Sequence, residues 1–115
     1  MKDGYVQKPH NGKVRRWVQT MELRDNPALI AEYRKRHSQG QIWPEILQGI
    51  RDCGLYDMEI YILGTRLVMI CDGPEDLNWD EAMQKMAQGP RQTEWEAFMS
   101  TFQQCGKDER SDEKW

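Results

Sequence analysis

Two kinds of hydrophobic periodicity divide the chain into strands and helices. Apolar and polar side chains alternate over residues 14–23 and again over residues 56–63 and 66–72, and Gly64-Thr65 predicts a hairpin turn between the last two. Apolar side chains spaced three or four residues apart predict helices at residues 27–38, 44–53, 79–88 and 91–104. This order indicates an α+β protein with a split βαβ, ferredoxin-like layout that stops before its usual fourth strand.

Capping residues mark the starts of two of these helices. Asp25 or Asn26 is expected to cap the first helix, since Pro27 suits its first turn. Asn78, with Glu81 three residues on, resembles a capping box at the start of the third. Both starts are therefore predicted from polar side chains that satisfy free backbone N–H groups.

Length and charge restrict the protein class. The chain has 115 residues and a net charge of −3, which argues against the basic stripe of a nucleic-acid-binding domain. No apolar run approaches the roughly 18 residues needed to cross a membrane. We expect a disordered arm at residues 1–13, one domain at residues 14–105 and a charged tail at residues 106–115. Because such a core is small, pairing with a second copy is expected.

Cysteine and histidine usage gives no support to a cofactor or a metal site. Cys53, Cys71 and Cys105 are an odd number without CxxC spacing, which favours reduced thiols in a cytoplasmic protein. Only His37 lies outside the arm, because the other histidine is His10, and no HExxH, GxGxxG or GxSxG motif is present. We therefore expect neither a bound metal nor a cofactor.

His37 is the strongest candidate for proton-transfer chemistry. Imidazole exchanges protons near neutral pH, and Tyr33 lies one turn earlier on the same helix face. The competing interpretation is that both side chains only pack beneath the sheet. The cations at residues 34–36 are expected to be solvated.

The second predicted strand and the tryptophans leave further alternatives. Met58 belongs to an apolar strand face, whereas Glu59 and Tyr61 share the other. Glu59 would need a polar partner if it pointed inward and would have no role if it pointed to solvent. Four tryptophans of the domain either fill the core or provide flat walls for a neutral sugar: Trp17, Trp43, Trp79 and Trp95.

Several short motifs resemble the L-rhamnose mutarotase family over roughly residues 15–115. The matching motifs are Asn26-Pro27, "EYRKRH" at 32–37, "IWPE" at 42–45, Ile60-Tyr61, and Trp95 followed by Phe98-Met99. The most specific is a tyrosine four residues before a histidine, followed by "IWPE". "DMEIY" at 57–61 and "EKW" at 113–115 look closer to a branch associated with L-fucose.

The resemblance implies a dimeric α+β barrel and a cofactor-free exchange between the anomers of a 6-deoxy sugar. It makes His37 the proton donor and Tyr33 a sugar contact, with Trp95 as a wall. Where the family has a strand tyrosine and a second tryptophan, this chain has Met58 and Glu94. These differences remove a hydroxyl and add a charge, so the preferred sugar need not be L-rhamnose.

Two more departures concern the backbone. Five residues, 38–42, separate His37 from Trp43 where three are usual, which is expected to shift the end of the first helix. The resemblance also implies a last strand after residue 115, so we expect the chain to be truncated before it, and the missing strand would leave a sheet edge open.

We therefore expect a homodimeric mutarotase of L-fucose or L-rhamnose, with His37 as general acid/base and Tyr33, Met58, Glu59, Glu94 and Trp95 around the sugar. Two alternatives stay open. One is a non-catalytic sugar-binding or interaction protein on the same fold. The other is a small haem-dependent monooxygenase with His37 on the iron.

Overall fold

The computed structural model describes residues 12–38 and 40–104 of the chain. Most of the predicted arm, the predicted tail, His10 and Cys105 lie outside the described residues. Within them, no helix is long and apolar enough to cross a membrane.

Three antiparallel strands form the sheet. They are β1 (Val14–Glu22), β2 (Asp57–Leu63) and β3 (Arg66–Pro74), in the order β1-β3-β2. β3 is therefore the central strand, and it pairs with β2 across the tight turn that Gly64 and Thr65 predict. All three predicted strands are confirmed, although β3 extends two residues further than the alternation indicates.

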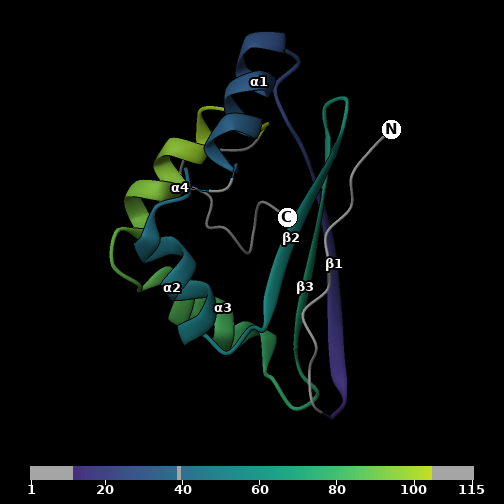
Figure 1. Cartoon of the computed structure of the whole chain (residues 1–115), viewed down its shortest axis with the longest axis vertical. Coiled ribbons are helices and arrows are strands. Elements are labelled where there is room, and N and C mark those ends of the chain that lie inside the picture. Colours follow the sequence, from purple (N-terminus) through teal and green to yellow (C-terminus); the bar gives the residue numbers. More distant parts are fainter. Residues whose placement is uncertain (1–11, 39, 105–115) are drawn as a thin grey trace.

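Four helices cover one side of this sheet, as Figure 1 shows. They are α1 (Pro27–Arg36), α2 (Pro44–Asp52), α3 (Trp79–Ala87) and α4 (Gln92–Ser100). All four predicted helices are confirmed, and the described part of the chain is the small α+β protein that the order of elements indicates.

Asn26, one of the two predicted candidates, and not Asp25, caps α1, and Asn78 caps α3 as predicted. Asn26 Oδ1 accepts hydrogen bonds from the backbone N–H groups of Ala28 and Leu29 at 3.0 and 3.2 Å. Asn78 Oδ1 accepts one from Glu81 N at 3.1 Å. Each cap satisfies donors that the first helical turn cannot pair internally, so these starts follow from local sequence.

The predicted end of the last helix, residue 104, is wrong. α4 ends at Ser100, and the next residues turn back toward the end of β1. Gln103 bridges Leu23, and Gln104 N donates to Glu22 O at 2.9 Å. The backbone groups of Gln103 and Gln104 therefore pair with the end of β1 and the residue after it, and these long-range hydrogen bonds replace the ones that a further helical turn would make.

The apolar face of the sheet carries the core. One cluster of buried side chains lies beneath α1, α2 and α4: Met21, Leu23, Tyr33, Ile46, Leu67, Trp95, Met99 and Phe102. A second lies toward α3: Cys53, Leu55, Met69, Cys71, Ala82, Met83 and Met86.

No helix of the described residues covers the opposite, outer face of the sheet (Figure 1). Val18 and Leu63 on this face are 57% and 72% exposed, and Tyr61 is also exposed. Since strand side chains alternate, the same three strands bury one row of residues and expose the other.

Candidate functional site

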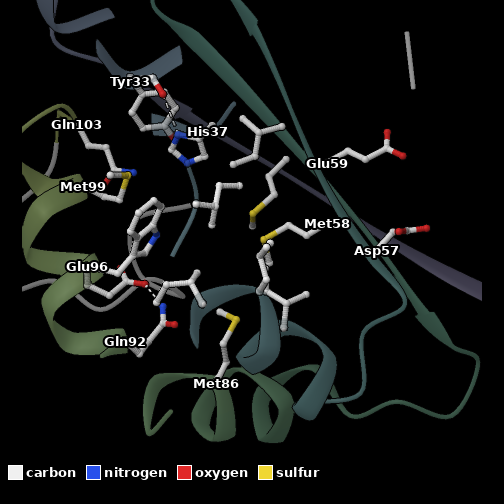
Figure 2. A pocket seen from close by; sticks show the side chains of 17 residues that line it. Tyr33, His37, Asp57, Met58, Glu59, Met86, Gln92, Glu96, Met99 and Gln103 are labelled. Carbon is white, nitrogen blue, oxygen red and sulfur yellow. Dashed lines mark hydrogen bonds between the residues drawn. The ribbon is translucent and has the colours of Figure 1, made fainter. Parts of the chain in front are cut away.

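A cavity of about 310 Å³ lies between the inner face of the sheet and the helices. Its size is at the lower end of the range for small-molecule sites. Figure 2 shows side chains converging on it from α1, α2, α4 and β2. The lining residues that carry the argument below are Tyr33, His37, Met58, Gln92, Trp95, Glu96 and Gln103.

His37 is fixed at the end of α1 by its own helix. Its Nδ1 lies 2.9 Å from the backbone carbonyl of Tyr33, and its ring stacks on the Tyr33 ring with centroids 4.1 Å apart. Because a carbonyl only accepts, Nδ1 carries the proton of the neutral ring. The other nitrogen, Nε2, then has a free lone pair and points into the cavity in Figure 2.

Burial favours the uncharged forms of both side chains of this pair. It lowers the pKa of the His37 imidazole below its ordinary value, and the hydrogen bond to the Tyr33 carbonyl works in the opposite direction. Burial also raises the pKa of the Tyr33 phenol well above its ordinary value, against a hydrogen bond with Gln103 and together with the charge of Glu96. Neutral His37 is thus available as a proton acceptor.

An aromatic wall supports His37 from the side of α4. The Trp95 ring meets the imidazole edge to face with centroids 5.6 Å apart. Trp95 in turn packs against Trp43 at 5.1 Å, and Trp43 stacks on Phe98 at 6.1 Å. These contacts fix the imidazole plane, because rotating it would displace a packed ring.

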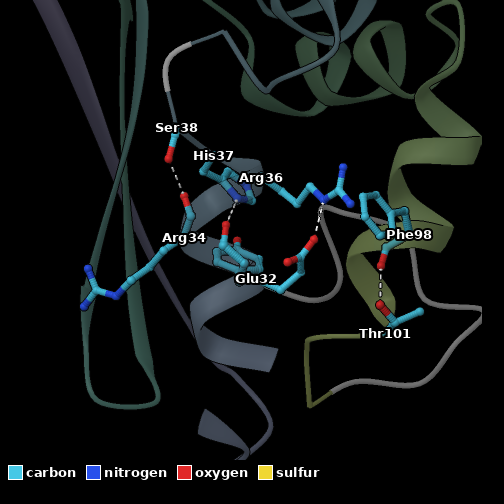
Figure 3. A network of polar contacts seen from close by, with 8 residues as sticks. Glu32, Arg34, Arg36, His37, Ser38, Phe98 and Thr101 are labelled. Carbon is cyan, nitrogen blue, oxygen red and sulfur yellow. Dashed lines mark hydrogen bonds and ion pairs between the residues drawn. The ribbon is translucent and has the colours of Figure 1, made fainter. Parts of the chain in front are cut away.

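The cations of α1 lie outside the cavity. Arg36 Nε pairs with Glu32 Oε1 at 2.7 Å, and its guanidinium lies 5.3 Å from the centre of the Phe98 ring (Figure 3). Ser38 Oγ donates to the Arg34 carbonyl at 2.9 Å, which fastens the last turn. The connection between His37 and Trp43, which is two residues longer than usual, is thus fastened to α1 at its first residue.

The two predicted residues of β2 have different positions. Met58 belongs to the cavity wall, on the same strand face as Ile60. Glu59 also borders the cavity, but Figure 2 shows its carboxylate pointing away from it, as does that of Asp57. Tyr61 Oη donates to Glu59 Oε2 at 2.7 Å on the outer face, so the outward alternative holds for Glu59.

The carboxylate of α4 that reaches the cavity is Glu96, not Glu94. The Glu94 side chain is 63% exposed and pairs with Arg91 at 3.3 Å. Glu96 lines the cavity beside Trp95, and Gln92 Nε2 donates to its Oε1 at 2.7 Å. Successive helix residues are rotated by about 100°, so these two glutamates point in nearly opposite directions.

Sequence reasoning missed three polar residues of the site. Gln92, Glu96 and Gln103 line the cavity, and both glutamines are buried. For Gln92 and Glu96 the available signal was spacing, because both fall on the same helical stripe as Trp95 and Met99. Gln103 lies beyond the end of α4 and gave no such signal. Polar side chains on an apolar stripe indicate either a buried network or a binding site.

The charges and the metal-binding capacity of the lining side chains limit which molecules the cavity can accept. Of the described residues, none of those lining it is a lysine or an arginine. Nor do three histidine, cysteine, aspartate or glutamate side chains of the described chain converge as a metal site. The arrangement therefore suits a small neutral molecule with both hydroxyl and apolar groups.

Comparison with known proteins identifies the family of the chain. Residues 16–115 match the family model described as L-rhamnose mutarotase. The chain is 33% identical over 102 residues to the L-fucose mutarotase of Xanthomonas campestris pv. campestris, covering 89% of this chain and 82% of that protein. It is 30% identical over 83 residues to the L-rhamnose mutarotase of Phocaeicola vulgatus, covering 71% and 75% respectively.

The fold agrees as well. The crystal structure of an L-rhamnose mutarotase from Formosa agariphila superposes with a TM-score of 0.59 at 26% identity, covering 80% of this chain and 82% of that one. The motifs around Tyr33 and His37, the family match and this superposition lead to the same conclusion. The chain belongs to the L-rhamnose mutarotase family.

Proposed function

We propose that this protein is a carbohydrate isomerase that interconverts the α and β anomers of a neutral 6-deoxy-L-sugar, L-fucose or L-rhamnose. The observation that supports this most directly is the geometry of His37. Its Nδ1 is engaged by the Tyr33 carbonyl at 2.9 Å, which leaves Nε2 facing the cavity as a proton acceptor.

The reaction requires one proton to move between two oxygens on the same carbon. Nε2 of neutral His37 takes the proton of the anomeric hydroxyl, the carbonyl forms at C1, and the bond from C1 to the ring oxygen breaks. The imidazolium returns the proton to the ring oxygen, giving a neutral open-chain aldehyde. After rotation about the C1–C2 bond, the same transfers in reverse close the other anomer.

The other predicted residues shape the site around this transfer. Tyr33 holds the imidazole by its carbonyl and its ring, while Trp95 and Met58 offer apolar surface to the C–H groups and the methyl group of the sugar. No step needs a metal or a cofactor, because the proton both leaves and returns through one imidazole.

Anomer exchange measured by saturation-difference NMR tests the proposal. With L-fucose and L-rhamnose, wild type should exchange the anomers faster than buffer, and His37→Ala should lose on the order of 10²–10⁴-fold. The chain's second histidine gives the matched control, since His10→Ala should behave as wild type. Equal exchange by wild type and His37→Ala would remove His37 from the mechanism, and sugar binding without exchange would favour the non-catalytic alternative.

We also propose that the protein forms a homodimer through the outer face of the sheet, completing an α+β barrel. Exposed Val18 and Leu63 supply apolar area that one copy leaves in water, and a small domain gains stability by burying such area. Sedimentation should give a dimer, and Val18→Asp should give a folded monomer. A wild-type monomer at all concentrations would contradict this.

The two free cysteines of the described residues, Cys53 and Cys71, are buried, and we propose a cytoplasmic location on this basis, because thiols stay reduced in the cytoplasm.

A further inference from the structure

The cavity has two unlike walls. On the side of α4 and the turn after it, Gln92, Glu96 and Gln103 contribute amide and carboxylate groups. The facing wall from α2, α3 and the sheet is mainly apolar, with Ile46, Leu47, Ile50, Met58, Ile60 and Met86. Asp57 and Glu59 on β2 also border it, but their carboxylates point away from the cavity (Figure 2). A ligand that fills the cavity therefore meets hydrogen-bonding groups on one side and hydrocarbon or sulfur on the other.

Glu96 is held in a defined direction on the polar wall. Gln92 is only 4% exposed, and its Nε2 donates to Glu96 Oε1 at 2.7 Å from one helical turn away. A carboxylate can accept about four hydrogen bonds, and Gln92 is one of the partners of Glu96. The packed amide thus orients the carboxylate where it lines the cavity.

The chemistry of this wall selects hydroxyl groups. A carboxylate accepts two O–H donors well, and charge-assisted hydrogen bonds are about twice as strong as neutral ones. With no lysine or arginine among the lining residues, an anionic sugar would be repelled by Glu96, whereas a neutral sugar with neighbouring hydroxyls would donate hydrogen bonds to it. The methyl group of a 6-deoxy sugar then has the apolar wall opposite.

The position of Glu96 separates it from the proton-transfer centre. In Figure 2, His37 lies beside Tyr33 at one end of the cavity, while Glu96 and Gln92 lie together at another part of the wall. A sugar with its anomeric carbon at His37 therefore turns other hydroxyls toward Glu96. L-fucose and L-rhamnose differ in configuration at C2 and C4, so these hydroxyls distinguish the two sugars.

We propose that Glu96, oriented by Gln92, accepts hydrogen bonds from sugar hydroxyls remote from the anomeric carbon and so determines which 6-deoxy sugar the protein prefers. This inference rests on the proposed function, because it assumes a sugar whose anomeric carbon lies at His37. Glu96 acts here on binding and choice of sugar, and His37 on the proton.

The test compares Glu96→Gln with Glu94→Gln. Both variants remove one carboxylate from α4 and keep the side-chain shape, but only Glu96 lines the cavity. For the preferred sugar, Glu96→Gln should lower kcat/KM by about 10- to 100-fold, mainly through a higher KM, as expected for loss of a charged hydrogen-bond acceptor. The ratio of kcat/KM for L-fucose and L-rhamnose should move toward one, whereas Glu94→Gln should keep both values.

A second variant checks the orienting contact. Gln92→Met removes the amide that donates to Glu96 while keeping most of the buried volume. It should change the ratio between the sugars in the same direction by a smaller factor. Thermal melts of all three variants identify any loss that reflects unfolding.

Sugar titrations followed by ligand-observed NMR separate the two proposals. If wild type binds sugar but exchanges no anomers, the mutarotase proposal fails, and weaker, less selective binding by Glu96→Gln still supports its binding role. If wild type exchanges anomers and Glu96→Gln matches Glu94→Gln in KM and in sugar ratio, the inference about Glu96 is overturned. A loss confined to kcat and equal for both sugars also overturns it.

Discussion

The α1 and α4 sides of the cavity are built by different means. On α1, the proposed proton acceptor His37 is placed by contacts within one helix, because it hydrogen-bonds to and stacks on Tyr33 one turn earlier. On α4, the wall depends on contacts between distant segments, such as Trp95 on Trp43 and Gln103 beside Leu23.

The starts of the two helices differ in the same way. Asn26 caps α1 with its own side chain, whereas the N-cap position of α4 is Arg91, which has a φ of 61° and makes no side-chain cap hydrogen bond. The Arg91 guanidinium lies 4.0 Å from the centre of the ring of Trp43, a residue on the loop before α2. A local motif can therefore place the proposed proton acceptor, while the shape of the site around it depends on long-range packing.

The largest expected effect tests the long-range side of this comparison. Trp95→Ala removes a ring that is 7% exposed and contacts His37, Trp43 and Phe98, so the free energy of unfolding should fall by about 3–5 kcal/mol. Trp79→Ala, which removes a partly exposed ring stacked on Trp17, should cost clearly less. Urea unfolding at one protein concentration measures both. Equal losses would show that Trp95 does not support the wall as described.

A smaller effect is expected where the two sides meet. Tyr33→Phe removes a buried hydroxyl that hydrogen-bonds with Gln103, and the loss in the free energy of unfolding should be about 1–3 kcal/mol. Tyr61→Phe removes a hydroxyl bonded to Glu59 on the outer face, so its cost should stay within about 0.5 kcal/mol. The same unfolding measurement applies, and a larger loss for Tyr61→Phe would reverse the comparison.

The smallest expected effect is the pH dependence of the free energy of unfolding that comes from His37 on α1. Burial lowers the pKa of folded His37 below its unfolded value of about 6.5, so the unfolded chain binds more protons between the two values. This contribution to stability is complete above about pH 6.5 and is lost as the pH falls through that value toward the folded pKa. Urea unfolding of wild type and His37→Asn at several pH values across this range measures this contribution as the difference between their free energies of unfolding.

The rate should follow the same group. Under the proposed role of neutral His37 as proton acceptor, kcat/KM should stay on its plateau below pH 6.5 and decline only near the lower pKa of His37 in the folded protein. If the NMR signal of the His37 imidazole titrates at or above pH 6.5 in the folded protein, both expectations are contradicted.

Much of the fold could be predicted from short-range patterns. Alternation predicted all three strands, and helical spacing predicted all four helices, because each pattern reflects which faces must be buried. The caps at Asn26 and Asn78 were readable because they act within a few residues. The end of α4 was not readable, because its last groups pair with β1, some 80 residues earlier in the chain.

The site divides along the same line. The sequence by itself determined that Tyr33 and His37 share one helix face, since that depends only on a spacing of four residues. Tertiary structure alone decided that Glu96 and not Glu94 lines the cavity, that Glu59 points outward, and that Gln103 reaches Tyr33. Each helix residue is rotated by about 100° from the last, so the choice of cavity residues depends on how α4 packs against its distant neighbours.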